Sequence, residues 1–161
     1  MAGMKYLVLH CTATPEGREV TSDEIRHWHT DPVKEGGRGW KQVGYTDMIH
    51  LDGKVERLVK NNEDAEVDPW EITNGAAGFN SVSRHVVYVG GLATDGKTTK
   101  DTRTEAQVKA MTAYVRDFHE RFPQIRIVGH GELPGVKKAC PSFNVQDWLR
   151  SIGIKQVKVK K

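Results

Sequence analysis

The sequence predicts one α/β domain with a central β-sheet of mixed direction that is flanked by helices. Short apolar, β-prone runs are interspersed with helical segments, and no strict strand–helix–strand repeat is present. This arrangement is typical of a mixed sheet covered by helices. A single domain of 161 residues buries roughly two-thirds of the surface of its unfolded chain, which is enough for a hydrophobic core.

The strands are predicted from short runs of apolar and β-branched residues. The first run ends in a histidine, His10. Two further runs flank Asp52-Gly53, a dipeptide typical of a two-residue hairpin turn. The expected strands cover residues 5–10, 45–51, 54–59, 84–89 and 125–128.

The helices are predicted from capping residues and apolar periodicity. Thr21 with Glu24, and Thr104 with Gln107, each fit a capping box at a helix start. The second of these helices has an apolar stripe with steps of three and four residues, made of Val108, Met111, Val115, Phe118 and Phe122. The expected helices cover residues 21–30, 104–122 and 146–152.

Two stretches are predicted to be loops. Residues 34–44 contain four glycines, and residues 61–80 show no clear period and contain Pro69, Gly75 and Gly78. Long loops inside compact domains are more often functional than other loops. We therefore expect residues 61–80 to form a long surface excursion.

Composition and charge exclude several classes of protein. Two cysteines cannot supply a disulfide framework, and the balance of residues excludes collagen-like, disordered and membrane-spanning chains. The net charge of +3 is slight and comes partly from a lysine-rich end. No nucleic-acid motif is present, so nucleic acid is not an expected partner. The first residues lack a signal-peptide pattern, so we expect synthesis in the cytoplasm.

Candidate metal ligands follow two of the expected strands. His10 and His130 each come at a strand end, where α/β sheets place their ligand crevices, and Cys140 follows ten residues after His130. Two imidazoles and one thiolate are the protein ligand count of a catalytic zinc site, with one position left open. By spacing alone, a hydrogen-bonded structural histidine and a small buried cysteine remain alternatives.

A series of ordered motifs carries a resemblance to a known family. The series contains Leu-Val-Leu-His-Cys-Thr at residues 7–12, Gly-Tyr at 44–45, Gly-His-Gly-Glu at 129–132 and Lys-Ala-Cys-Pro-Ser-Phe at 138–143. This order resembles the zinc-dependent N-acetylmuramoyl-L-alanine amidases of the phage lysozyme type, which are similar to peptidoglycan recognition proteins. The resemblance covers about residues 4–152. It implies an amidase catalytic domain over residues 1–152 with the same fold, followed by a basic tail over residues 153–161.

The resemblance also implies roles for individual residues. His10, His130 and Cys140 match the ligands of one zinc ion per chain, and Tyr45 and Lys138 match catalytic residues beside it. The implied reaction hydrolyses the amide between N-acetylmuramic acid and L-alanine in peptidoglycan. Lys138 would donate to the oxyanion, and Tyr45 would orient the water or relay a proton. Simple packing of Tyr45 and solvation of Lys138 are the alternatives.

The remaining polar residues receive weaker expectations. Asn80 and His85 are candidate substrate-binding residues, and His85 is also a candidate contact to a metal ligand. We expect His27 and His29 both to be exposed, with a groove-lining role as the alternative, because they lie two residues apart on a helix. Cys11 is expected to be a bystander, since strand neighbours point to opposite faces. A disulfide between Cys11 and Cys140 is the rival use of the cysteines.

The leading functional hypothesis is a phage or prophage lysin that acts on the cell wall after release or export. An exported antibacterial amidase toxin, a non-catalytic peptidoglycan-binding module and a domain with structural zinc or no metal are the alternatives. Peptidoglycan is the expected partner. We expect a monomer that does not insert into a membrane.

Overall fold

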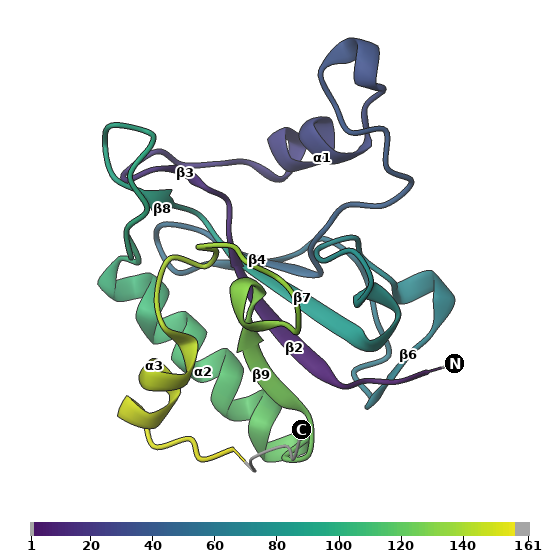
Figure 1. Ribbon diagram of the computed structural model, residues 1–161, viewed down its shortest axis with the longest axis vertical. Coiled ribbons are helices and arrows are strands. Elements are labelled where there is room, and N and C mark those ends of the chain that lie inside the picture. The colour runs from purple at the N-terminus through teal and green to yellow at the C-terminus, as the bar shows by residue number, and fades with distance from the viewer. Residues whose placement is uncertain (1, 157–161) are drawn as a thin grey trace.

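The fold is a five-stranded mixed sheet, seen in a computed structural model that describes residues 2–156 (Figure 1). The strand order is β5-β4-β7-β2-β9. Parallel pairing joins β4 to β7, β7 to β2 and β2 to β9, and antiparallel pairing joins β4 to β5. The strands are β2 (Tyr6–Cys11), β4 (Asp47–Ile49), β5 (Val55–Arg57), β7 (Ser83–Tyr88) and β9 (Arg126–Gly129). All five expected strands are therefore confirmed, with ends within two residues of the expected ones.

The three helices also lie where the sequence predicts them. They are α1 (Ser22–Thr30), α2 (Glu105–Arg121) and α3 (Val145–Ser151). Thr21 and Thr104 accept the predicted backbone N–H bonds, and both capping boxes are complete. These side chains satisfy amide groups that have no partner within the helix.

The sheet is covered on both faces because its buried strands alternate their side chains between two cores. On one face Leu7, Leu9 and Val86 pack with Met111 of α2 and Leu149 of α3. The other face contributes Met48, Val87 and Val89 to a core with Ile25 of α1. Figure 1 shows α2 and α3 lying together beside the sheet, well apart from α1.

The segment over residues 61–80 is an excursion with short ordered pieces of its own. It contains β6 (Glu66–Val67), which pairs with β1 (Ala2–Gly3), and the short helices η2 (Pro69–Glu71) and η3 (Asn80–Val82). Val67, Glu71, Thr73 and Ala76 of this segment are buried. The segment is therefore packed against the domain over much of its length.

Other short elements complete the fold. A second two-stranded pair, which is parallel, joins β3 (Thr14–Pro15) to β8 (Gly91–Leu92), and η1 (Val33–Glu35) begins the glycine-rich loop. The packed structure continues past residue 152, since Ile154 is buried and the Gln156 side chain bonds both backbone groups of Ile127. The rest of the expected tail, residues 157–161, lies outside the described residues. Among the described helices, none has the length and apolar character needed to cross a membrane.

Candidate metal centre and cleft

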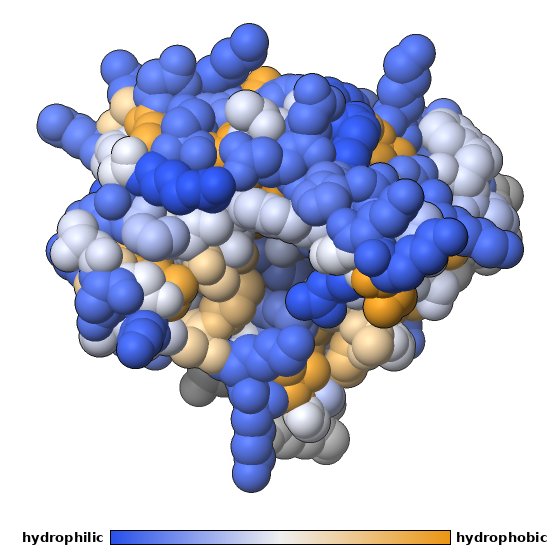
Figure 2. Space-filling view, turned by 90° about the horizontal axis from the view of Figure 1, so that it is seen from above, coloured by the Kyte–Doolittle hydropathy of each residue, from blue (hydrophilic) through white to orange (hydrophobic). Residues whose placement is uncertain are grey.

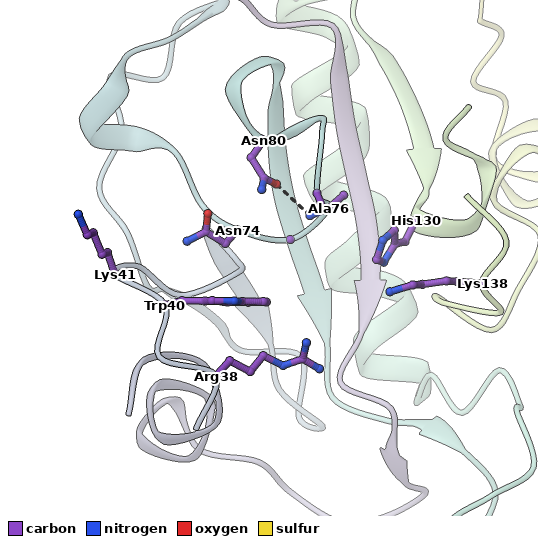
Figure 3. A pocket seen from close by; sticks show the side chains of 10 residues that line it. Arg38, Trp40, Lys41, Asn74, Ala76, Asn80, His130 and Lys138 are labelled. Carbon is purple, nitrogen blue, oxygen red and sulfur yellow. Dashed lines mark hydrogen bonds between the residues drawn. The ribbon is translucent and has the colours of Figure 1, made fainter. Parts of the chain in front are cut away.

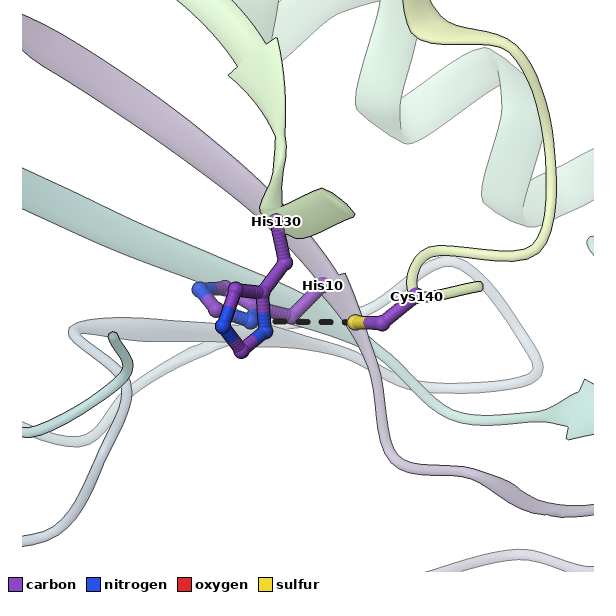
Figure 4. A group of neighbouring side chains, drawn as sticks. All are labelled: His10, His130 and Cys140. Carbon is purple, nitrogen blue, oxygen red and sulfur yellow. Dashed lines mark hydrogen bonds between the residues drawn. The ribbon is translucent and has the colours of Figure 1, made fainter. Parts of the chain in front are cut away.

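Three candidate ligands converge at the carboxyl ends of neighbouring parallel strands. His10 lies near the end of β2, and His130 begins η4 (His130–Glu132) directly after β9. Cys140 reaches them from the loop before α3 (Figure 4). One ligand atom from each of the three side chains lies within 4.8 Å of the others. The register of β2 with β9 produces this convergence, because parallel strands end at the same edge of a sheet.

The donor set fits zinc in geometry and in chemistry. His10 Nδ1 lies 3.8 Å from Cys140 Sγ. Nitrogen and sulfur ligands of a tetrahedral zinc lie about 3.5 Å apart, so this pair needs little adjustment. Burial, followed by the neighbouring His85 and His130, lowers the pKa of His10, and burial also lowers the pKa of His130. Both imidazoles are therefore neutral at pH 7, the form that binds a metal.

The candidate ligand Cys140 is held in place by its loop. The Cys11 N–H donates to Cys140 Sγ at 3.3 Å, and the buried Tyr88 hydroxyl donates to the Pro141 carbonyl at 2.7 Å. Ser142 Oγ donates to the Gly91 carbonyl at 2.9 Å. The loop from Cys140 to Ser142 is thus fixed to β2, to β7 and to the chain after β7.

The two cysteines are free thiols, and only Cys140 belongs to the metal cluster of the described residues. The hydrogen bond with the Cys140 side chain lowers the pKa of Cys11 to about 7, and the same contact raises the pKa of Cys140. A metal reverses this order, because a coordinating thiol is deprotonated. Cys11 is therefore a close neighbour of the cluster rather than a member of it.

Tyr45 packs directly against the cluster. Its ring centroid lies 5.1 Å from that of His10 and 5.3 Å from that of His29. Burial, followed by the nearby cysteine sulfurs, raises the pKa of the Tyr45 phenol. The hydroxyl therefore keeps its proton at neutral pH and is available as a hydrogen-bond donor.

Two adjoining clefts open beside the candidate ligands. A cleft of about 400 Å³ is lined by all three ligands together with Tyr45. It continues into a cleft of about 530 Å³, where Lys138 and His130 stand on one side and Arg38, Trp40 and Lys41 on the other (Figure 3). Figure 2 shows a largely hydrophilic face with a recess near its centre. Among the described residues that line the two clefts, none is acidic, so the site favours an anionic or neutral ligand.

Asn80 and His85 lie in different positions relative to the clefts. Asn80 lines the larger cleft, whereas His85 is fully buried and lines neither of them. His85 Nδ1 lies 2.8 Å from His10 Nε2, and His85 Nε2 lies 2.9 Å from Asn80 Oδ1. Burial lowers the pKa of His85 to about 3, so this ring is neutral as well.

The expectation for His29 is wrong, and the expectation for His27 is confirmed. The His27 side chain is 47% exposed and contacts Asp31, whereas His29 is buried in the smaller cleft. His29 Nδ1 accepts the Gly44 N–H at 2.9 Å, and burial followed by Arg38 lowers the pKa of His29 to about 4. The two side chains do point in different directions, and His29 is the one that points into the smaller cleft.

Sequence reasoning also missed Arg38 and Trp40. The guanidinium of Arg38 lies 5.1 Å from the Trp40 ring, and the His29 ring lies 4.8 Å from the same ring. Both residues come from the glycine-rich loop, which carries no periodic signal. The signal available in the sequence was the presence of an aromatic and a basic residue inside such a loop.

The comparisons agree with this site. The sequence pattern of the N-acetylmuramoyl-L-alanine amidase family matches residues 2–143. The chain belongs to this family. The match includes His10, His130 and Cys140, so the whole candidate centre lies inside the amidase region.

Individual relatives include phage proteins. The chain is 32% identical to the endolysin of Enterobacteria phage K11 over 143 residues, which cover 89% of this amidase and 83% of that protein. It is 31% identical to the endolysin of Escherichia phage T7 over 142 residues, or 88% and 83% of the two chains.

Solved structures show the same fold. The Ph2119 endolysin from a Thermus scotoductus MAT2119 bacteriophage superposes with a TM-score of 0.68 at 26% identity, covering 96% of this amidase and 88% of that chain. Bumblebee PGRP-SA has a TM-score of 0.66 at 18% identity, covering 99% and 87% of the two chains. The expected amidase-like fold is therefore confirmed.

Proposed function

We propose that the protein is a zinc-dependent amidase that cleaves peptidoglycan between N-acetylmuramic acid and L-alanine, acting as a phage endolysin. The convergence of His10, His130 and Cys140 on one point at the cleft floor is the observation that carries this proposal. Membership of the amidase family and the phage endolysins among the relatives support it.

Each residue of the proposed metal centre would have a defined role. His10, through Nδ1, His130 and Cys140 would hold one zinc ion. Bound zinc supplies a Lewis acid and lowers the pKa of water to about 7. The two neutral imidazoles and one thiolate leave that ion with a net positive charge, which preserves its Lewis acidity.

The remaining cleft residues would act on the amide directly. The exposed Lys138 shares the cleft with His130, and its ammonium group would donate to the oxyanion that forms when the amide is attacked. The protonated Tyr45 hydroxyl would donate a hydrogen bond to the attacking water or pass a proton to the departing amine.

The opposite side of the cleft would bind the peptide. Arg38 and Lys41 give that side positive charge, and Trp40 gives it a flat apolar surface. Stem peptides of peptidoglycan carry carboxylates, which a basic cleft without acidic lining residues attracts. We further propose that the enzyme acts as a monomer, and that it is made in the cytoplasm and reaches the wall after release.

Product analysis of digested cell walls tests the proposal. Purified sacculi incubated with the protein should release stem peptides with a free L-alanine amine and leave the glycan strands intact. New reducing sugar ends without free L-alanine amines would refute the amidase assignment. Binding to sacculi without any cleavage would instead favour the non-catalytic module. Cys140 argues against that module, because it completes the ligand set of a hydrolytic centre.

A further inference from the structure

A chain of hydrogen bonds runs from the backbone to the ring nitrogen of His10 that faces away from Cys140. The Ala76 N–H donates to Asn80 Oδ1 at 2.9 Å, as Figure 3 shows. Asn80 Oδ1 lies 2.9 Å from His85 Nε2, and His85 Nδ1 lies 2.8 Å from His10 Nε2. The remaining ring nitrogen of His10, Nδ1, is the one that lies 3.8 Å from Cys140 Sγ.

The direction of every bond in this chain follows from its first member. A backbone N–H can only donate, so the Asn80 atom that faces Ala76 is the oxygen rather than the amide nitrogen. That oxygen also faces His85, which must therefore carry its proton on Nε2. A neutral imidazole has one N–H, so His85 Nδ1 is an acceptor and receives the Nε2–H of His10. The Nδ1 lone pair of His10 is then free.

We propose that Asn80 and His85 are positioning residues that hold His10 in the Nε2–H tautomer and aim its Nδ1 at the metal. The inference rests on the proposed zinc site. Partners behind a ligating histidine fix the orientation and the tautomer of its ring, and their loss typically weakens metal binding about 10- to 100-fold. The usual partner is a carboxylate or a carbonyl. Here the partner is a second buried imidazole, and its tautomer is fixed by Asn80, whose oxygen is oriented by the Ala76 backbone N–H.

The packing around His85 keeps this ring in place. A side chain at Gly75 would put its first carbon 2.6 Å from His85 Nδ1 and 2.7 Å from the Gly44 carbonyl oxygen. The backbone at residue 75 therefore lies directly against the imidazole, at a distance that glycine allows. The segment over residues 61–80 thus supplies both Asn80 and the backbone surface that confines His85. This gives the excursion a role at the metal centre besides lining the cleft.

Zinc affinity measured by competition with a chromophoric chelator tests the proposal. Asn80→Ala should weaken zinc binding about 10- to 100-fold, because His85 loses its acceptor. Asn80→Asp should stay within about threefold of wild type, since a carboxylate accepts from both Ala76 and His85. Asn62→Ala is the matched control and should bind zinc as wild type does, because the Asn62 side-chain amide donates to Asp68, away from the His85 chain. Equal affinity in Asn80→Ala and wild type would overturn the proposal.

The ring ¹⁵N shifts of the histidines in the full wild-type chain give a second, direct test. In the zinc-free protein His10 and His85 should both be protonated on Nε2, and zinc should shift Nδ1 of His10 alone within this pair. A proton on Nδ1 of His10 would contradict the inference without any variant. If the chain binds zinc but does not cleave sacculi, the proposed function fails and the positioning role stands. If it cleaves sacculi and His10 carries the other tautomer, the positioning role fails.

Discussion

Two clusters of polar side chains lie in this domain, and they differ in how charge is balanced within them. The ion cluster consists of Asp47, Arg57, Glu63, Arg84 and Tyr114, and it pairs unlike charges. Asp47 Oδ1 accepts from Arg57 Nε at 2.6 Å and Asp47 Oδ2 accepts from the Tyr114 hydroxyl at 2.6 Å, while Glu63 contacts Arg57 and Arg84.

The candidate metal centre instead gathers bases that repel one another when charged. In the described part of the chain, the hydrogen-bond partners of His10 are His85 and Cys140, and no carboxylate is among them. Burial keeps the three imidazoles of His10, His85 and His130 neutral. A cluster that already contains its counter-charges needs no ligand, whereas a cluster of neutral donors around an open cleft is built to receive a cation.

Removal of the thiolate should break the metal centre and leave the ion cluster intact. Cys140→Ser should lose stoichiometric zinc and more than about 100-fold of the activity on sacculi, exceeding the loss expected for a partner behind a ligand. Metal analysis of the purified protein measures this. Cys11→Ala is the control and should retain about one zinc per chain; zinc retained by Cys140→Ser would remove Cys140 from the ligand set.

Removal of one charge from the ion cluster should lower the stability of the fold and leave zinc binding unchanged. Asp47→Ala leaves the Tyr114 hydroxyl without its acceptor and Arg57 without one of its two carboxylate partners, and should lower the free energy of unfolding by about 2 kcal/mol. Urea denaturation measures the loss, and a chelator competition should find zinc affinity unchanged. A large change in zinc affinity without a loss of stability would contradict the claim that the ion cluster serves stability and the other cluster serves metal binding.

Lys138 should separate chemistry from metal binding. Lys138→Ala should keep one zinc per chain and lose about 100-fold in kcat, the typical effect of removing one oxyanion donor. Steady-state hydrolysis of a soluble muropeptide measures this loss. Lys137→Ala, one residue earlier on the same exposed loop, should behave as wild type. Equal turnover in the two variants would make Lys138 an ordinary loop lysine.

The neutral imidazoles should make the zinc-free protein sensitive to acid. A histidine with a folded pKa of about 4, such as His29, takes up a proton near pH 6.5 only when the chain unfolds. The free energy of unfolding should therefore fall as pH drops below 6.5, by at most about 1.4 kcal/mol per pH unit for each such group.

The buried His29 of α1 provides a direct test of this effect. His29→Gln should flatten the pH dependence of the urea midpoint between pH 6.5 and about pH 4, because the buried ring is gone. A slope unaffected by His29→Gln would show that this ring is not held neutral.

Local patterns predicted most of the fold. The capping boxes at Thr21 and Thr104 and the Asp52-Gly53 turn are complete within a few residues, so no distant contact is needed to recognise them. The candidate metal ligands could be proposed from the sequence because His10 and His130 mark strand ends and the surrounding motifs are family motifs. Their convergence itself required the register of β2 with β9.

The parts that escaped prediction depend on contacts between distant segments. His29 became buried because Tyr45 and Trp40 pack on its ring, which helical spacing cannot reveal. The hydrogen bond between His85 and His10 joins residues that are 75 positions apart, and only the pairing of β2 with β7 brings them together. Ile154 extends the core beyond the expected boundary because the chain after α3 folds back on it.

The central claim is that a single zinc at His10, His130 and Cys140 makes this chain an amidase. The most direct measurement is a zinc titration of the metal-free protein, with the release of L-alanine amines from sacculi as the readout. The rate should be near zero without metal, rise linearly with added zinc and level off at one equivalent per chain. Full activity without metal, or a plateau at a different stoichiometry, would contradict the account.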